Sequence, residues 1–418
     1  NLNVRMKKIA KYLVVFFILI ALYCLFAVLS CMLPDQAVKC HVKKAAATLF
    51  MEGNYPRAII DEEACRRDNF TDALILNQIY TIDRTRPVRS ATAITRMNMD
   101  PMYDQTGILY KLTQQDTTFV PIDYARYWHG STFLFRIILA ITSFTTLQRL
   151  MSMTIALLFV IFICCYYPRA GLWKTLVWVV SWVLVNGFAT QFSMQFFPIW
   201  ALTLAASILV VRAGSHAPSL GMLFFVTASL TSYFDLLTTP VLTLGWPLLV
   251  WLSLYDSREQ KMAGKIRQIF LICLLWSVGY ILTFATKWLI GTVVLGKNVF
   301  LDAYGSAICH ITAEEHTRWD TIVRNIEMLP LDMVCLSLIF FAGITLFHFR
   351  MSGGKMALLY LVVATGPLLW YIVLYQHDYM HNWFTYRLLA VSLAALFLSL
   401  LSWNGDPKRP LTNRYARE

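Results

Sequence analysis

Apolar residues along this chain gather in runs of helix length, separated by short polar segments. The first run, Tyr12–Met32, follows the basic residues Arg5, Lys7, Lys8 and Lys11. An apolar helix of about 20 residues spans the hydrocarbon core of a bilayer and satisfies its backbone hydrogen bonds internally. This run is too long for the core of a signal peptide, and no small-residue cleavage site follows it. We therefore expect an uncleaved signal-anchor helix.

The later apolar runs predict an all-α polytopic membrane protein with about ten transmembrane helices. The stretch Ser131–Leu147 is apolar but contains Arg136 and several hydroxyl side chains. We predict that it forms an amphipathic helix on the outer surface. The later predicted spans are Leu150–Tyr167, Trp173–Ala189, Phe197–Val211, Leu220–Tyr233, Val241–Tyr255, Ile269–Lys287, Leu331–Phe349, Met356–Tyr375 and Leu388–Trp403.

Composition agrees with a membrane protein, since 58% of the residues are hydrophobic and only 14% are charged. Soluble domains carry about 25% charged residues. The net charge of +12 does not indicate nucleic-acid binding, because the basic residues lie mostly at the ends of apolar runs. Among the short loops, most of the lysine and arginine falls on the side of both chain ends, which predicts that both ends are cytoplasmic.

This topology divides the chain into four parts. Residues 1–32 form a cytoplasmic N-terminus and the first span, and residues 33–149 form a long extracytoplasmic loop with surface helices. Residues 150–403 form the remaining membrane bundle, with outer loops at 296–327 and 376–387, and residues 404–418 form a basic cytoplasmic tail. The short cytoplasmic loops contain no glycine-rich phosphate motif, which disfavours a nucleotide-driven mechanism.

The first outer loop contains a dense acidic stretch between Asp61 and Asp72. A helix is predicted over His41–Met51, ending before Gly53, and another over Asn69–Tyr80 with Asp68 or Asn69 as its N-cap. Asp68 and Asp72 are four residues apart and share one helical face, where their charges repel unless a partner lies between them. They are candidates for catalysis. The structural alternative is an N-cap and a first-turn charge favoured by the helix dipole.

Asp123 to Gly130 closes this loop with aromatic and basic residues. Arg126 and His129 are candidates for binding a sugar or a lipid phosphate, and the alternative for the aromatic residues is an interfacial belt. Asp235, in a tight outer turn, is a candidate for a wet cavity or a helix cap. Lys287, at the outer end of its span, either snorkels or binds a phosphate.

The last outer loop packs His377, Asp378, His381 and Arg387 between two apolar runs. Arg387 begins the final span, where a buried cation requires an anionic or polar partner, so we predict a binding function for this loop.

The sequence assigns neither a metal site nor a disulfide pairing. His310 and Glu314 share helical spacing, as do His316 and Asp320, so a divalent metal is conceivable, but no recognised ligand pattern occurs and we assign no metal ligand. Cys40 and Cys65 both lie in the outer loop and are candidates for a disulfide, with Cys31 and Cys309 near the same face.

The layout resembles the GT-C class of membrane glycosyltransferases over almost the whole chain. The shared features are a cytoplasmic N-terminus, one span, a long acidic first outer loop with surface helices, and then many spans. By position Asp61, Glu62, Asp68 and Asp72 all match the carboxylate base of that class, and the clearer helix after Asp68 favours Asp68 or Asp72.

The resemblance implies transfer of a sugar from a polyprenyl-phosphate donor to an extracytoplasmic acceptor, namely a glycan, cell-wall polymer, lipid or protein. Arg126, Lys287 and Arg387 would hold the phosphate, and His129, His377 and His381 would orient the phosphate or sugar hydroxyls. Inversion at the anomeric carbon and a bacterial cytoplasmic membrane are expected. A transporter or flippase of a lipid-linked substrate is the alternative, although no internal repeat is present.

Overall fold

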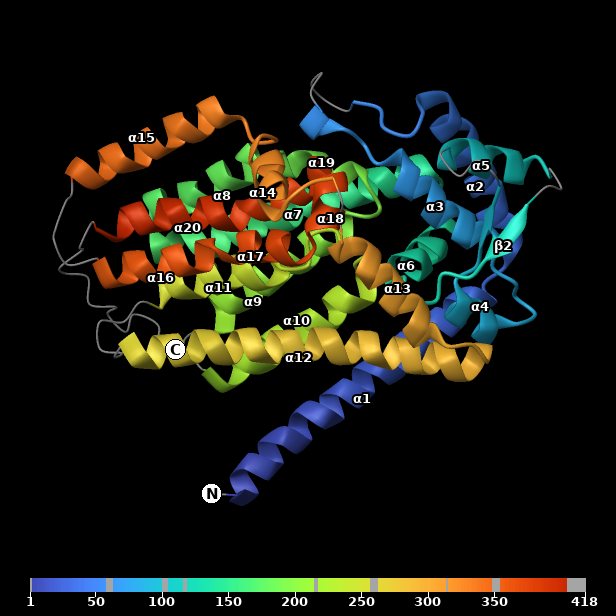
Figure 1. Cartoon of the computed structure of the whole chain (residues 1–418), viewed down its shortest axis with the longest axis horizontal. Helices are drawn as coiled ribbons and strands as arrows, with labels where there is room; N and C mark the ends of the chain where they lie inside the picture. Colours follow the sequence, from blue (N-terminus) through green and yellow to red (C-terminus); the bar gives the residue numbers. More distant parts are fainter. Residues whose placement is uncertain are drawn as a thin grey trace.

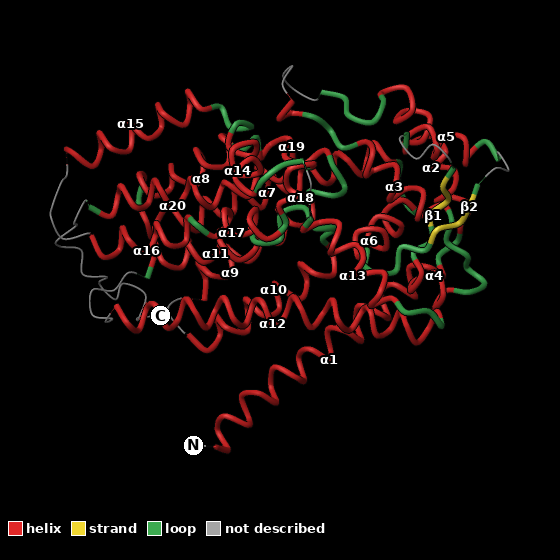
Figure 2. The backbone as a smooth tube through the Cα atoms, in the orientation of Figure 1, coloured by secondary structure: helices red, strands yellow, loops and turns green. Residues whose placement is uncertain are grey.

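The computed structural model describes residues 2–57, 63–99, 104–115, 119–213, 217–255, 262–312, 315–347 and 354–403. These residues are almost entirely helical, and the sheet they contain has two short antiparallel strands, in which Arg96 pairs with Ile122. Figure 2 shows the helices as the main component of the backbone.

The N-terminal half contains one long helix, a group of short elements and then the first helices of a bundle. Its elements are α1 Leu2–Met32, α2 Asp35–Glu52, η1 Glu63–Cys65, α3 Asn69–Tyr80, α4 Pro87–Ala93, β1 Arg96–Asn98, α5 Gln105–Thr113, β2 Val120–Ile122, α6 Gly130–Leu139, α7 Phe144–Ala170, α8 Leu172–Leu184, η2 Gly187–Phe192 and α9 Phe197–Ala213.

The C-terminal half continues the bundle and ends on its central helix. Its elements are α10 Ala217–Phe234, α11 Leu242–Leu254, α12 Met262–Leu295, α13 Val299–Ile311, α14 Arg318–Ile326, α15 Leu331–Phe347, α16 Gly354–Ala364, α17 Gly366–Val373, α18 Tyr375–Met380, α19 Asn382–Thr385, η3 Tyr386–Leu388 and α20 Leu389–Ser402.

Within the described residues, five helical segments are long and apolar enough to cross a membrane. A sixth candidate is the pair α14 and α15, which is bent by 76°. Shorter apolar helices, among them α8 to α11, pack with them. The prediction of an α-helical membrane protein with several spans is therefore confirmed. The five segments are Met6–Met32, Phe144–Ala170, Met262–Leu295, Gly354–Val373 and Asn382–Ser402.

The final segment is the centre of the bundle. In its most apolar window 89% of the residues are buried, compared with 22% in α1 and in α7. α20 packs against α8, α11, α15 and α16. Beside it lies an aromatic core in which the Trp178 and Trp246 rings are 4.9 Å apart and the Trp200 and Trp246 rings 5.8 Å apart. A side chain at the start of α20 is therefore held by a rigid, densely packed helix.

The short elements between α1 and α7 form a cap at one end of the bundle (Figure 1). α2 stops before Gly53, as predicted, where a φ of 79° favours glycine, but it begins at Asp35 and not at the predicted His41. α3 has the bounds predicted for it and packs against α2, α5 and α6. Its first turn, which carries the candidate carboxylates, is thus enclosed by the cap.

The stretch Ser131–Leu147 forms α6, a turn and the start of α7, instead of one continuous helix. α6 packs against α1, α2, α3 and α10, and it buries Phe133, Phe135 and Leu139. It therefore lies between the cap and the bundle, with protein on several sides.

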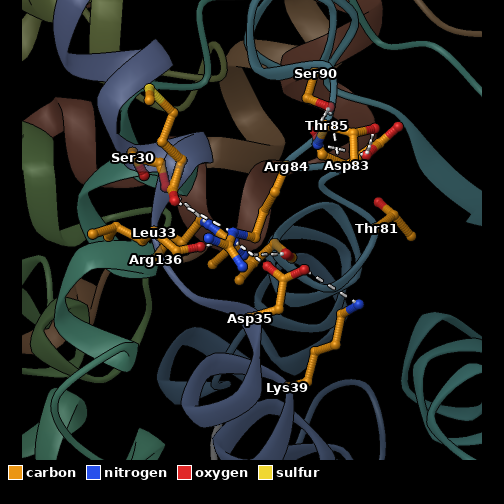
Figure 3. Close-up of polar contacts among 12 residues, drawn as sticks. Ser30, Leu33, Asp35, Lys39, Thr81, Asp83, Arg84, Thr85, Ser90 and Arg136 are labelled. Atoms are coloured by element: carbon orange, nitrogen blue, oxygen red, sulfur yellow. Dashed lines mark hydrogen bonds and ion pairs between the residues drawn. The ribbon is translucent and has the colours of Figure 1, made fainter.

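Arg136 of α6 joins the cap to the first span (Figure 3). Its fully buried guanidinium donates to the carbonyls of Ser30 and Ile79 at 3.0 Å, to that of Leu33 at 3.2 Å and to the Asp35 carboxylate at 2.5 Å. A buried charge is costly unless it is paired and hydrogen-bonded, and here every guanidinium nitrogen has a partner.

We expect Arg136→Met to destabilise the protein by about 3 kcal/mol, because it leaves several carbonyls and Asp35 without their donor. The measurement is the apparent Tm of the detergent-purified protein, followed by tryptophan fluorescence. Arg84→Met is the matched control, since the exposed Arg84 makes a 3.3 Å bond to the carbonyl of Met32. Equal melting of the two variants would contradict this role of Arg136.

Candidate functional site

The candidate carboxylates lie at the start of α3. Asp68 is the N-cap, and its Oδ1 accepts a hydrogen bond of 3.0 Å from the backbone N–H of Thr71. Asp68 therefore has the structural role considered for it from the sequence, that of an N-cap. However, Asp68 is only 1% exposed and its Oδ2 is buried without a hydrogen-bond partner among the described residues. Capping therefore uses one oxygen and leaves the other for chemistry.

Asp72 lies one turn further along α3 and is fully buried. Its Oδ1 accepts a hydrogen bond of 2.9 Å from the backbone N–H of Met194, and the Ser193 hydroxyl also donates to this carboxyl. As in Asp68, its Oδ2 has no partner in the described part of the chain. The turn between η2 and α9 thus fixes the orientation of the Asp72 side chain.

Arg387 approaches the same region from the start of the central helix. Its Nη2 donates to the carbonyl of Ala64 at 3.0 Å and its Nη1 to that of Trp383 at 3.4 Å. The side chain is 1% exposed, its Nε has no partner among the described residues, and none of their carboxylates pairs with it. Its charge acts on Asp68. The fold thus brings together Asp68, Asp72 and Arg387, three of the predicted site residues.

The environment separates the proton affinities of the two carboxyls. Burial raises the pKa of Asp68 to about 6, although the Thr71 hydrogen bonds and the Arg387 charge oppose the rise. Burial and the neighbouring Asp68 charge raise the pKa of Asp72 well above its ordinary value. Asp72 therefore holds its proton more strongly than Asp68, so Asp68 is the first of the pair to ionise as the pH rises. An ionised carboxylate with a free oxygen is suited to general-base catalysis.

A second group contains three histidines and a buried acid. The His377 ring lies 5.0 Å from the His310 ring and 4.8 Å from the His381 ring. The Nδ1 of His377 lies 3.0 Å from the Oδ1 of Asp378, whose Oδ2 is buried without a described partner. Burial lowers the pKa of His377 and of His310 to about 4 and raises that of Asp378 well above its ordinary value. The two imidazoles are therefore mostly uncharged near neutral pH, burial favours the protonated form of Asp378, and all three can act as hydrogen-bond partners.

The third group surrounds residues 124–129 and α12. Arg126 lies over the Tyr124 ring, 4.3 Å from its centroid, and its Nη1 is 3.5 Å from the Asp302 carboxylate. His129 has an Nε2 that lies 3.1 Å from the carbonyl of Tyr124. Burial and the Lys287 charge lower the pKa of His129 well below its usual value, so it is neutral.

Lys287 and Asp235 are both bonded within the protein, and their contacts are neither snorkelling nor a helix cap. Lys287 is buried and donates to the carbonyl of Thr92 at 2.8 Å, so it binds the C-terminal end of α4 instead of snorkelling. Asp235 accepts hydrogen bonds from the backbone and hydroxyl of Thr238 in its turn. Its Oδ2 is buried without a partner in the described residues.

Ring contacts connect the first group to the second, and the charge of Arg126 connects the second to the third. The Phe196 ring lies beneath the Arg387 guanidinium at 5.1 Å and is 5.4 Å from the Phe384 ring. Phe384 stacks on His381 with ring centroids 5.2 Å apart. The Arg126 charge acts on His310. These contacts connect the carboxylate pair with Arg387 to the histidines, and the histidines to the group around Arg126.

Other predictions have separate outcomes. Asp61, Glu62, Glu314 and the tail at 404–418 lie outside the described residues. Cys40 and Cys65, which were candidates for a disulfide, are not paired, because all nine cysteines are free. No group of three or more His, Cys, Asp or Glu in the described ranges is arranged to hold a metal ion. His316 instead stacks on Tyr379 at 3.7 Å, and Asp320 forms a capping box with Thr317.

Sequence reasoning missed the contribution of Ser193 and Met194, which hold Asp72. The turn at Gln191–Gln195 is recognisable in the sequence, but a backbone N–H donor has no residue signature. It also missed the pairing of Arg67 with Glu52 at 3.2 Å and of Arg66 with Glu63 at 2.8 Å. These two pairs explain why neither arginine neutralises the Asp68–Asp72 pair by direct contact.

No protein-family model matches the chain, and neither a curated protein nor a solved structure is significantly similar to it. The functional interpretation of the site therefore depends on its geometry and chemistry.

The raised pKa of Asp68 predicts a pH-dependent stability. Its ordinary pKa is 3.8 and its pKa in the fold is about 6, so the folded protein retains a proton that the unfolded chain has lost in this range. The free energy of unfolding should therefore fall as the pH rises from about 4 to about 6, by up to about 3 kcal/mol. Asp68→Asn removes this loss. The stability of the variant minus that of the wild type should therefore be larger at pH 7.5 than at pH 4.5.

The apparent Tm of both proteins at the two pH values is the measurement. Asp83→Asn serves as the control with the opposite sign, because the Thr85 hydroxyl and backbone lower the pKa of the exposed Asp83. If the apparent Tm of Asp68→Asn differs from that of the wild type by the same amount at both pH values, the predicted titration is contradicted.

Proposed function

We propose that this protein is a membrane glycosyltransferase. It moves a sugar from a polyprenyl-phosphate donor to an extracytoplasmic acceptor hydroxyl. The observation that supports this proposal is that the buried Arg387 is bonded to Ala64 of the first loop and its charge acts on Asp68, which in turn acts on Asp72. A base and a fixed cation are the two groups that such a transfer requires.

In the proposed reaction Asp68 is the general base. Its free Oδ2 takes the proton of the acceptor hydroxyl as that oxygen forms a bond to the anomeric carbon of the sugar. The bond between the anomeric carbon and the phosphate oxygen breaks, and the electron pair leaves with the polyprenyl phosphate. A single displacement of this kind inverts the anomeric configuration. The leaving phosphate carries the activation energy, so a nucleotide is not required.

Arg387 stabilises the negative charge that develops on the leaving phosphate. Because α20 is the most buried span, the guanidinium is held in position before the reaction and little reorganisation is needed. Asp72 stays protonated and donates a hydrogen bond from its free oxygen. The histidines of the second group and Arg126 of the third orient the sugar hydroxyls and the acceptor.

In the proposed topology about ten helices cross the membrane, with the short apolar helices α8 to α11 among them. The cap and the three groups face the extracytoplasmic side, and both chain ends face the cytoplasm. The positive charge of the short loops on the side of the chain ends supports this orientation. A bacterial cytoplasmic membrane is the proposed location.

The test compares turnover of a panel of polyprenyl-phosphate sugars by purified wild type, Asp68→Asn and Asp72→Asn. Asp68→Asn keeps the capping oxygen but removes the base, so turnover should fall by about 100-fold or more. Asp72→Asn should keep most of the turnover, because asparagine resembles the neutral acid and still accepts the Met194 bond. The kcat/KM of the wild type should rise with pH through about 6, the pKa of Asp68.

Both variants should melt at temperatures close to that of the wild type at low pH, which separates chemistry from folding. Unchanged turnover in Asp68→Asn would overturn the assignment of the base. Movement of the intact donor across the membrane without any product would favour a transporter of lipid-linked substrates instead.

A further inference from the structure

A groove of about 440 Å³ opens beside the carboxylate pair, at the N-terminal end of α7. Arg67 and Phe192 line it on one side, and Thr145, Gln148, Arg149 and Met153 of α7 line it on the other. Arg67 directly precedes Asp68, and Phe192 directly precedes the Ser193–Met194 turn that holds Asp72. The groove and the reaction centre therefore share the same two backbone segments.

The polar part of the groove contains several donors suited to an anion. Arg149 is exposed and forms no ion pair with any described residue. Arg67 uses its Nη1 to pair with Glu52 at 3.2 Å, but its Nε is buried without a described partner. The Nε2 of Gln148 is likewise buried and has no partner among the described residues. Guanidinium and amide donors that line one groove are suited to a phosphate.

The apolar part of the groove leads towards the membrane. Met153 follows Arg149 by one helical turn, and Ala156 and Val160 continue the same face of α7. All three are exposed, and they lie within a helix long and apolar enough to cross a membrane. A ligand with a phosphate at Arg149 and a long apolar tail on this face would match both parts. A phosphate without a tail would match only the first.

We propose that this groove is the docking site for the phosphate of a polyprenyl phosphate, with the isoprenoid tail lying along α7. The site lies outside the reaction centre and brings the lipid next to Asp72 before its phosphate reaches Arg387. The identity of the lipid in this inference rests on the proposed function. The test measures binding of the lipid and not turnover.

The experiment places the photoreactive residue p-benzoylphenylalanine at Met153 of the full-length protein in phosphatidylcholine nanodiscs. Radiolabelled polyprenyl phosphate is the probe. We expect crosslinking at position 153 that excess unlabelled polyprenyl phosphate removes, and that polyprenol, phosphatidylglycerol or inorganic phosphate does not. The same photoreactive residue at Leu271, an exposed apolar position on α12, should crosslink only at background level.

The charge requirement is tested with Arg149→Gln and Arg67→Gln, each of which should lower the apparent affinity of the probe about tenfold. Arg89→Gln is the matched control, because Arg89 is an exposed arginine that lines a different small pocket in the cap. Arg149→Gln should also raise KM for the donor more than it lowers kcat.

Three results would overturn the inference. The first is that phosphatidylglycerol displaces the probe as effectively as polyprenyl phosphate does. The second is that Arg89→Gln lowers the affinity for the probe as much as Arg149→Gln and Arg67→Gln do. The third is that Arg149→Gln and Arg67→Gln leave the crosslinking unchanged. The proposed function fails separately. Crosslinking that depends on Arg149 without any sugar transfer would keep the docking site and remove the glycosyltransferase, whereas transfer that depends on Asp68 but not on Arg149 would do the reverse.

Discussion

A buried guanidinium at the start of the central helix is the constraint on which the candidate site depends. Arg387 cannot reach water, so its donors must find acceptors within the protein. It donates to the carbonyl of Ala64, 323 residues earlier in the chain. That bond holds the 63–68 segment of the first loop against the bundle, and Asp68 is thereby brought into the electrostatic range of Arg387. The site exists because one cation requires a carbonyl from the cap.

Two buried arginines in this protein have different roles, and their hydrogen bonds show the difference. Arg136 engages each of its three guanidinium nitrogens with protein acceptors, among them the Asp35 carboxylate. Arg387 donates to two carbonyls, and its Nε has no partner in the described residues. The first therefore joins the cap to α1 and α6, whereas the second keeps both charge and donor capacity for a substrate.

Asp68 and Asp72, like Arg387, combine bonded atoms with one polar atom that has no described partner. Asp68 and Asp72 each use one oxygen to hold local structure, through Thr71 and Met194 respectively, and each keeps a buried oxygen without a described partner. Their proton affinities differ because of this burial and their proximity, with Arg387 favouring the charge on Asp68. A proton acceptor and a proton donor of the same residue type thus arise from differences in environment alone. The groove lined by Arg67, Phe192 and α7 opens next to the segments that carry this pair.

Several features were determined by the sequence alone. Apolar runs of helix length specify membrane helices because unpaired backbone groups are too costly in lipid. The bounds of α3 and its cap at Asp68 followed from local capping rules, and the stop of α2 followed from Gly53. Charge density also drew attention to Asp68, Asp72 and Arg387 as separate candidates.

Tertiary structure decided how these candidates combine. Only packing could show that Arg387 meets Ala64, that the Met194 N–H holds Asp72, and that Cys40 and Cys65 stay free. Backbone donors and long-range contacts leave no residue pattern that a reader of the sequence can detect. Ser131–Leu147 is divided where Ser143 caps the start of α7, whereas the partners of Arg136 within α6 come from α1, α2 and α3. A local apolar pattern reports how much of a segment is buried, whereas the partners that bury it come from distant parts of the chain.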